Sequence, residues 1–376
     1  MSSLLPPSAG VAIQVIGPAY LDEVVEVEGA LCPEADVRID YSRTEAHRTP
    51  LAEPGTFLLI ESPGGDRIRI TDPSAQSGSR IILAEERIVD AAGPAPPLRS
   101  EVALSGQRAM LGGMGAGYAL ALGGRLVLPL GGELGREGRE ICRLLDAHGI
   151  AYRAVQVPGQ PTDTTVLIWS SAGDKLPIGR RTASAAVRSE ALLAQCSPAD
   201  VTLVTSLPNA TAARLVRALR GWVMFTPSLR NVREGGLGEV AARVNAMSMN
   251  RIEWQGAERQ VGERCPLVVV TRGAEGASVR FRDKRGALRW VSVPAGPVAE
   301  VLDANHAGEA YTAGFLAALV ERQWPEAMRA GAYSPEAVRE AAWRGALAAA
   351  LELGMRELAF PSRDEVAALR AKAPAP

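Results

Sequence analysis

A carboxylate stands at the start of an expected helix, behind a loop of small residues. The segment 303–310 has the sequence Asp-Ala-Asn-His-Ala-Gly-Glu-Ala and leads into an apolar stretch that runs to Val320. Unbonded backbone N–H groups and the positive end of the helix dipole make such a helix start a binding site for anions. Glu309 could act as a general base beside that anion. Alternatively, Glu309 only stabilises the helix through the dipole.

A second carboxylate follows an expected strand at 244–249. Asn250 and Glu253 are three residues apart, which places the amide and the carboxylate on one side of a first helical turn. The carboxyl ends of parallel strands are where α/β sheets bind ligands, and hard oxygen ligands suit Mg²⁺, usually through water. Alternatively, the two residues form an ordinary helix cap.

Two glycine-rich segments could let a ligand approach the backbone. Residues 112–117 have the sequence Gly-Gly-Met-Gly-Ala-Gly, but a dinucleotide-binding GxGxxG would need glycine where Tyr118 stands. The segment also follows a polar stretch and not the first strand, so a Rossmann dehydrogenase is disfavoured, and a tight turn into a helix at 116–122 is the alternative. Residues 271–277, Thr-Arg-Gly-Ala-Glu-Gly-Ala, form by themselves only a glycine hairpin between two apolar strands.

Composition excludes several classes of protein. Among 376 residues, Lys and Arg (41) nearly balance Asp and Glu (42), so nucleic acid and anionic membranes are not expected partners. No Gly-Lys dipeptide exists for a P-loop, and no apolar run reaches the ~20 residues of a membrane span. We find no signal peptide and expect a cytoplasmic protein. Three histidines and scattered cysteines make a zinc site or a disulfide framework improbable; the cysteines are Cys32, Cys142, Cys196 and Cys265.

The alternation of apolar and polar segments predicts an α/β fold with a largely parallel sheet covered by helices on both faces. The first buried strand is expected at 11–16. Residues from about 30 to 100 are expected to form a β-rich excursion that contains a hairpin turn at 63–66. The strands expected elsewhere are 125–128, 165–169, 176–180, 201–205, 222–226, 244–249, 267–271 and 277–281. The helices expected are 116–122, 136–148, 210–220, 233–242, 306–322 and 334–353.

In this order, the features resemble the ribokinase-like (pfkB) family of carbohydrate and nucleoside kinases from Val11 to about Leu369, except in the excursion. Gly17 and Asp22 resemble the end of the family's opening strand and its substrate-binding Asp. Gly112-Gly113 with 119–124 is similar to the first signature, whose glycines contact the substrate. Residues 132–138 stand at the family's Gly-Asp-Asp…Phe-Gly stretch.

The second half of the chain carries three more similar segments. Asn250 and Glu253 match the family's NxxE motif, and 271–276 resembles its Thr-Leu-Gly…Gly element beside the nucleotide. Residues 303–309 lie on the second signature, Asp-Thr-Thr-Gly-Ala-Gly-Asp, and Ala313-Gly314-Phe315 follows as expected. The resemblance implies a three-layer fold with a mostly parallel central sheet flanked by helices, and a small β-sheet lid enlarged by an insertion.

The resemblance also implies cofactors and a role for each site residue. ATP would be the phosphate donor with Mg²⁺, and the acceptor would be a sugar-like or nucleoside-like small molecule. Glu309 would be the catalytic base. The other implied sites are an anion hole at His306, Ala307 and Gly308; nucleotide contacts at Thr271, Gly273, Gly276 and Asn305; substrate contacts at Asp22, Gly112, Gly113 and Gly117; and metal ligands at Asn250 and Glu253.

Four residues depart from the family pattern. Glu309 stands for the catalytic Asp, which moves the carboxylate by roughly an ångström. His306 replaces the first Gly of the anion hole; it is strained if φ is positive there, and its imidazole could reach phosphate oxygens. Gly117 replaces an Asn that would bind substrate, and Thr226 replaces an Asp that precedes a Pro.

Two hypotheses therefore stand. The chain is an ATP-dependent kinase that phosphorylates a hydroxymethyl group, or it is a catalytically weakened or inactive homologue that binds a small molecule in a regulatory role. We expect one domain over 1–376, a lid from about 25–108 plus 163–181, a frayed tail at 371–376, and a homodimer through exposed lid edges.

Overall fold

The computed structural model describes residues 3–4, 10–31, 39–40, 47–63, 65, 67–83, 88–89, 101–132, 134–171, 175–303, 305–355 and 358–373. The strands in these ranges are β1 (Ile13–Ile16), β2 (Tyr20–Val27), β3 (Ile39–Asp40), β4 (His47–Leu51), β5 (Thr56–Glu61), β6 (Arg67–Thr71), β7 (Gly78–Ile82), β8 (Ile88–Val89), β9 (Glu101–Gly112), β10 (Arg125–Gly131), β11 (Tyr152–Val157), β12 (Thr164–Ser170), β13 (Lys175–Arg180), β14 (Val201–Thr205), β15 (Trp222–Thr226), β16 (Ala246–Asn250), β17 (Leu267–Thr271), β18 (Ala277–Arg282) and β19 (Leu288–Val293). The helices are α1 (Met114–Leu122), α2 (Arg136–Ala147), α3 (Ala183–Ala186), α4 (Ser189–Leu193), α5 (Asn209–Ala218), α6 (Leu229–Glu234), α7 (Leu237–Ala241), α8 (Arg251–Val261), α9 (Ala307–Gln323), α10 (Glu326–Ala330), α11 (Pro335–Glu352) and α12 (Arg363–Lys372), with a short 3₁₀ turn η2 (Gly273–Glu275).

A nine-stranded sheet forms the centre of the molecule, in the order β11-β10-β1-β14-β15-β16-β17-β18-β19. All neighbours from β11 to β17 pair in parallel, and only the pairs β17–β18 and β18–β19 are antiparallel. Strands β14 and β15 are buried at every position, as expected for strands covered on both faces. The predicted α/β class with a mostly parallel sheet is confirmed.

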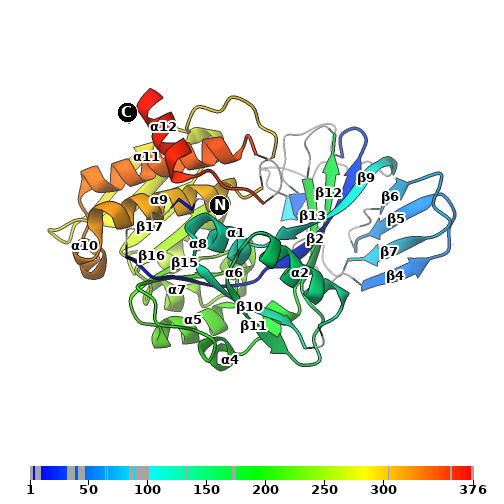
Figure 1. Cartoon of the computed structure of the whole chain (residues 1–376), viewed down its shortest axis with the longest axis horizontal. Helices are drawn as coiled ribbons and strands as arrows, with labels where there is room; N and C mark the ends of the chain where they lie inside the picture. The colour runs from blue at the N-terminus through cyan, green and yellow to red at the C-terminus, as the bar shows by residue number, and fades with distance from the viewer. Residues whose placement is uncertain are drawn as a thin grey trace.

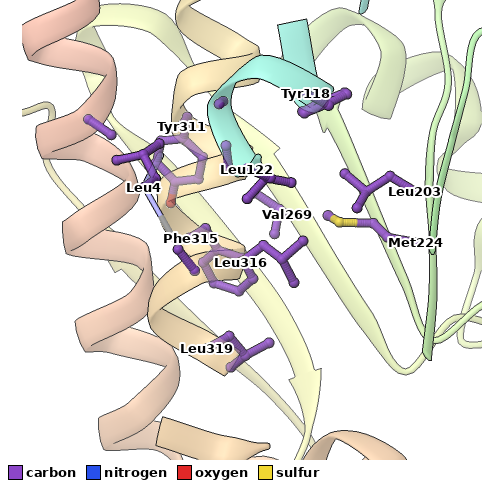
Figure 2. Close-up of a cluster of buried hydrophobic side chains, with 14 of the residues drawn as sticks. Leu4, Tyr118, Leu122, Leu203, Met224, Val269, Tyr311, Phe315, Leu316 and Leu319 are labelled. Atoms are coloured by element: carbon purple, nitrogen blue, oxygen red, sulfur yellow. The ribbon is translucent and has the colours of Figure 1, made fainter. Parts of the chain in front are cut away.

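Helices cover both faces of this sheet (Figure 1). Alternate strand residues point to opposite sides, so that Val15 joins one apolar cluster and Ile16 the other. The first cluster gathers side chains of α1, α2, α9 and α11, and part of it is shown in Figure 2. The second cluster gathers those of α4 to α8. No helix of the described residues is long and apolar enough to cross a membrane.

A second sheet of eight strands lies beside the central one, in the order β13-β12-β2-β9-β6-β5-β7-β4 (Figure 1). Its strands overlap the ranges expected for the lid, but β2 begins earlier, at Tyr20, and β9 ends later, at Gly112. Strands β3 and β8 pair with each other in a separate two-stranded sheet. The excursion supplies β4 to β7, and β5 pairs with β6 as the predicted hairpin, although Gly64 and Asp66 lie outside the described residues. That this sheet closes over a substrate stays a prediction.

Several elements differ from the expectation. The polar segment before Gly112, for which no strand was expected, forms the 12-residue strand β9, whose side chains alternate in exposure over much of its length. The helix expected at 233–242 is divided between α6 and α7 because Gly235 and Gly236 both have positive φ angles. The expected tail is helical through Lys372, and 374–376 lie outside the described residues.

Helices α9 and α11 cross at unusually close range, and this crossing fixes α9, which carries Glu309. A Cβ added to Gly314 would lie 2.8 Å from Cβ of Ala348 and 3.1 Å from the Arg344 carbonyl oxygen. Gly345 on α11 has the matching property toward Tyr311, at 2.8 Å from its carbonyl oxygen. Glycine is therefore required on both sides of the contact.

Replacing Gly314→Val is expected to force the two helices apart and to destabilise the fold by about 1–3 kcal/mol, the usual cost of overpacking. Chemical denaturation measures the change. Gly354→Ala is the matched control, because its added Cβ would make only an ordinary contact at 3.5 Å from the Leu351 carbonyl oxygen. Equal stability of the two variants would contradict the tight crossing.

Candidate active site

The predicted motifs gather around the carboxyl ends of the parallel strands. Asn250 ends β16 and is the register partner of Thr271, which ends β17. Ser248 of β16 and Thr312 of α9 share a hydrogen bond of 2.8 Å between their hydroxyl oxygens, so the start of α9 lies against the same edge. This is the edge at which α/β sheets bind ligands.

The start of α9 has the properties of an anion site. The N–H of Ala310 donates to the carbonyl of His306 at 2.8 Å, the first such bond of the helix, so the N–H groups of 307–309 precede the helical ladder. No side chain of the N-cap residue caps this helix. A Cβ on Gly308 would meet no heavy atom within 4 Å, which leaves open space above the backbone.

The loop before α9 is fixed from both sides. The N–H groups of Leu302 and Asp303 both donate to the carbonyl of Leu353, just beyond α11. The N–H of Asn305 donates to Oδ1 of Asp303 at 2.8 Å. His306 then takes φ 65° and ψ 0°, so the positive φ considered from the sequence is present. Ala304 lies outside the described residues.

Glu309, His306 and Gly117 meet at one point. The His306 Nδ1 lies 3.6 Å from Glu309 Oε1, and the two side chains are only 8% and 16% exposed. A Cβ added to Gly117 would lie 3.5 Å from His306 Nδ1, 3.5 Å from Glu309 Cγ and 3.4 Å from Phe360 Cζ. Sequence reasoning placed Gly117 in the first signature and both His306 and Glu309 in the second, and it missed Phe360.

Charge around His306 favours its protonated form. Burial lowers the pKa of the imidazole, but Glu309, Asp22 and Asp303 all raise it, and the net result is a raised pKa. The candidate base Glu309 and the candidate substrate ligand Asp22 therefore interact with the same imidazole.

Asp22 projects from β2 into a space that Gly112 leaves free. A Cβ on Gly112 would lie 1.9 Å from Asp22 Oδ2, so no other residue fits at 112 without moving the carboxylate. Oδ1 is buried without a hydrogen-bond partner. Burial raises the pKa of Asp22, against the opposing effects of Thr165, Arg181 and His306. A desolvated carboxylate with an unused acceptor is suited to a ligand hydroxyl.

Gly113 has a structural function at the turn into α1. Its φ is 94°, and an added Cβ would lie 2.8 Å from the Pro18 carbonyl oxygen. The tight turn considered as an alternative is therefore present, and it positions Gly117 and Asp22 on facing segments.

Asn250 and Glu253 form the complete helix cap that was the alternative interpretation. Asn250 Oδ1 accepts from the N–H of Glu253 at 2.9 Å, and Glu253 Oε2 accepts from the N–H of Asn250 at 2.8 Å. Tyr118 connects this cap to α9, since both Glu309 and Glu253 add to the burial that raises the pKa of its hydroxyl. The carboxylates of Glu253 and Glu309 thus both act electrostatically on the Tyr118 hydroxyl, and capping does not exclude a second function.

The two glycines among the predicted nucleotide contacts differ in how much space surrounds their backbone. Gly273 has φ 58° and no heavy atom within 4 Å of an added Cβ, which leaves its backbone accessible. Gly276 has φ 88°, and its added Cβ would lie 2.1 Å from the Val293 carbonyl oxygen, so here glycine serves packing. The connection is the 3₁₀ turn η2 between the antiparallel strands β17 and β18.

Sequence reasoning missed a cation beside Asp22. The Arg181 guanidinium carbon lies 3.6 Å from the centroid of the Tyr20 ring, and this arginine donates to the Thr164 carbonyl and to Thr165 Oγ1. Arginine is so frequent in this chain that the sequence carried no signal for this one. The hydroxyls of Thr205 and Thr226, at the ends of β14 and β15, are also buried without a hydrogen-bond partner.

Residues 125–360, more than half of the chain, match the model of the pfkB family of carbohydrate kinases. The chain belongs to this family. Among curated proteins, a nucleoside kinase of Methanocaldococcus jannaschii is 29% identical over 90 residues, which are 22% of this chain and 28% of that protein. The chain thus matches little more than a quarter of the length of that relative.

Solved structures show the same fold along nearly the whole chain. The Giardia lamblia ribokinase has a TM-score of 0.65 at 15% identity and covers 96% of this chain and 99% of its own. The nucleoside kinase of Methanocaldococcus jannaschii has a TM-score of 0.60 at 15% identity, and the match covers 96% of this chain and 98% of that one. An Arabidopsis thaliana ribokinase, solved with ribose and ATP, has a TM-score of 0.58 at 17% identity, and the match covers 96% of this chain and 98% of that one. The ribokinase-like fold predicted from the motifs is confirmed.

The raised pKa of Asp22 makes a prediction about stability. Because the folded state favours the protonated carboxyl, its contribution to stability is present below the ordinary value of 3.8 and is lost as pH rises through the folded pKa. At neutral pH, Asp22→Asn should therefore stabilise the ligand-free protein by about 1–3 kcal/mol.

The gain should shrink when thermal denaturation is repeated in acid, where both residues are neutral. Asp146→Asn, at an exposed position of α2, is the control and should change stability by less than about 0.5 kcal/mol. Destabilisation by Asp22→Asn at neutral pH would show that the ionised carboxylate supports the fold.

Proposed function

We propose that the chain is an ATP-dependent phosphotransferase that transfers the γ-phosphate to a hydroxymethyl group of a sugar or a related small alcohol. The observation that carries this proposal is the Glu309 carboxylate beside the N–H groups at the start of α9, within electrostatic reach of the same imidazole as Asp22. Membership of a family of carbohydrate kinases and the ribokinase-like fold support it.

The residues divide the reaction between them. Asp22 accepts a hydrogen bond from an acceptor hydroxyl through its unused oxygen. Glu309 takes the proton of the hydroxymethyl group while that oxygen attacks the γ-phosphorus and the bond to the ADP oxygen breaks. The N–H groups of 307–309 hold the charge on the transferred phosphoryl group. Thr271, Gly273, Gly276 and Asn305 border the proposed nucleotide site.

The residues near the strand ends fit a magnesium ion held largely by water and phosphate. The described residues contain no group of three His, Cys, Asp or Glu that could hold a metal. The cap engages Oε2 of Glu253 and the single side-chain oxygen of Asn250, whose carbonyl has a second lone pair. Such a sparse oxygen set is typical of Mg²⁺ bound with substrate phosphates. The ion would neutralise phosphate charge, and Asn250 and Glu253 would hold it through water.

One observation favours the alternative of a weakened or inactive homologue that binds a small molecule. His306 stands where the resemblance implies a glycine, and its Nδ1 lies 3.5 Å from the position of a Cβ on Gly117, where the resemblance implies a substrate-binding Asn. The hydrogen bond of that Asn to the substrate is therefore missing. The homodimer through the second sheet also stays a proposal; β13 and β4 are the two edges that it offers.

Glu309→Gln is expected to lower turnover by at least about 100-fold, because the amide cannot accept the proton. ADP release from Mg-ATP would be measured over pentoses, hexoses, sugar acids and nucleosides. Ser248→Ala is the structural control, since it removes a hydrogen bond to α9 but no reacting group. Turnover unchanged by Glu309→Gln would disprove the base, and thermal shifts by an acceptor without any turnover would favour the binding protein.

Glu253→Gln separates the cap from the metal. Glutamine retains the capping box, so stability should hold within about 0.5 kcal/mol, while loss of the negative charge weakens the hold on Mg²⁺. The Mg²⁺ concentration for half-maximal turnover should rise about tenfold. An unchanged Mg²⁺ requirement would restrict Glu253 to capping.

A further inference from the structure

Three of the four departures from the family pattern meet at one place. Ordinary contact distances separate an added Cβ on Gly117 from His306 Nδ1 and Glu309 Cγ, both at 3.5 Å. A single methyl group would therefore be tolerated at 117, but the amide of an asparagine would overlap the imidazole. The absence of a side chain at Gly117 of α1 therefore leaves room for the imidazole of His306, which precedes α9.

We propose that His306, as an imidazolium, is a positioning residue that pairs with Glu309 and holds this carboxylate over Gly117, so that the three replacements act as one unit. The kinetic part of this inference rests on the proposed function, whereas the pairing itself does not.

Geometry gives His306 this orientation. The left-handed conformation at the N-cap begins α9 at the next residue, and Glu309 follows in the first turn. Nδ1 is buried and has no hydrogen-bond partner, yet Glu309 Oε1 is only 3.6 Å away. Phe360 also lies beside His306, with its ring centroid 6.1 Å from that of the imidazole. A small movement would convert the contact into a charge-assisted hydrogen bond.

The charges that face His306 come from three elements. Glu309 belongs to α9, Asp303 to the loop before it, and Asp22 to β2 of the second sheet, and all three favour the imidazolium against burial. Gly117 of α1 and Phe360 of the segment before α12 bring no charge. One cation thus faces the base and the substrate carboxylate together.

The extra methylene of Glu309 has a purpose in this arrangement. An aspartate at 309 would withdraw the carboxylate by roughly an ångström from Nδ1. With His306 present, Glu309→Asp should therefore lower kcat about 10- to 100-fold, although aspartate is the family's own residue. The triple variant Glu309→Asp, Gly117→Asn and His306→Gly should have a kcat at least about tenfold higher than Glu309→Asp alone. If the effects of the three substitutions on kcat were simply additive, the proposal that they act as one unit would be wrong.

The pairing can be tested without turnover. The chain has three histidines, so the imidazole NMR signals can be assigned with His306→Gln and His148→Gln. One signal, that of His306, should titrate above the ordinary value of 6.5 and should fall on Glu309→Gln. Glu137→Gln, in the first turn of α2, is the matched control and should leave it unchanged. A His306 signal that ignores Glu309→Gln overturns the proposal.

The pH profile tests the positioning function. Turnover requires Glu309 to be ionised and His306 to be protonated. The value of kcat should therefore be lower in acid, where Glu309 is protonated, and lower again at pH values above the raised pKa of His306. His306→Gln should lower kcat more than it changes KM, and it should abolish the decrease of kcat at alkaline pH. His148→Gln, at the end of α2, should retain it. An alkaline fall that survives His306→Gln overturns the positioning function.

The two proposals fail in different ways. If no acceptor is phosphorylated, the proposed function fails, and the NMR titration still decides the pairing. If turnover depends on Glu309 while the His306 signal is indifferent to it, the kinase stands and the present inference falls.

Discussion

The backbone N–H groups at the start of α9 are the feature on which the rest of the structure depends. They can bind an anion only while they remain outside the helical ladder, and no N-cap side chain occupies them. The loop before them is held by two N–H groups donating to the Leu353 carbonyl, and the helix behind them is locked to α11 through Gly314 and Gly345. An open helix start is thus maintained by a closely packed helix pair.

The site contains several features that oppose folding. Asp22 has a buried oxygen without a partner, His306 has a positive φ, and two buried threonine hydroxyls at the strand ends lack partners. Unsatisfied polar groups and strained backbone each cost free energy, so their clustering at one edge requires compensation elsewhere. The fully buried strands β14 and β15 and the two apolar clusters around the central sheet provide it.

The sequence supported the α/β class because period and composition are local properties. Short runs rich in β-branched residues, such as 201–205, favour buried strands, and this one is confirmed as β14. The glycine pair Gly235-Gly236 was equally visible in the sequence, but the helix expected at 233–242 ran through it. Strand β9 escaped prediction because its outer residues are polar, and only pairing with β2 and β6 makes it a strand. The neighbours Arg181, Tyr20 and Phe360 escaped for the same reason: contacts between distant segments leave no local pattern.

The distribution of the candidate site over two sheets has a mechanical consequence. Asp22 belongs to the second sheet, whereas Glu309 is carried by a helix packed on the central one, and the short segment 17–19 connects β1 to β2. A change of angle between the sheets would therefore alter the separation of Asp22 and Glu309. Because His306 interacts with both carboxylates, its imidazole is the group whose surroundings would change most. The second sheet is thereby coupled electrostatically to the start of α9, without a residue of the excursion having to contact that helix.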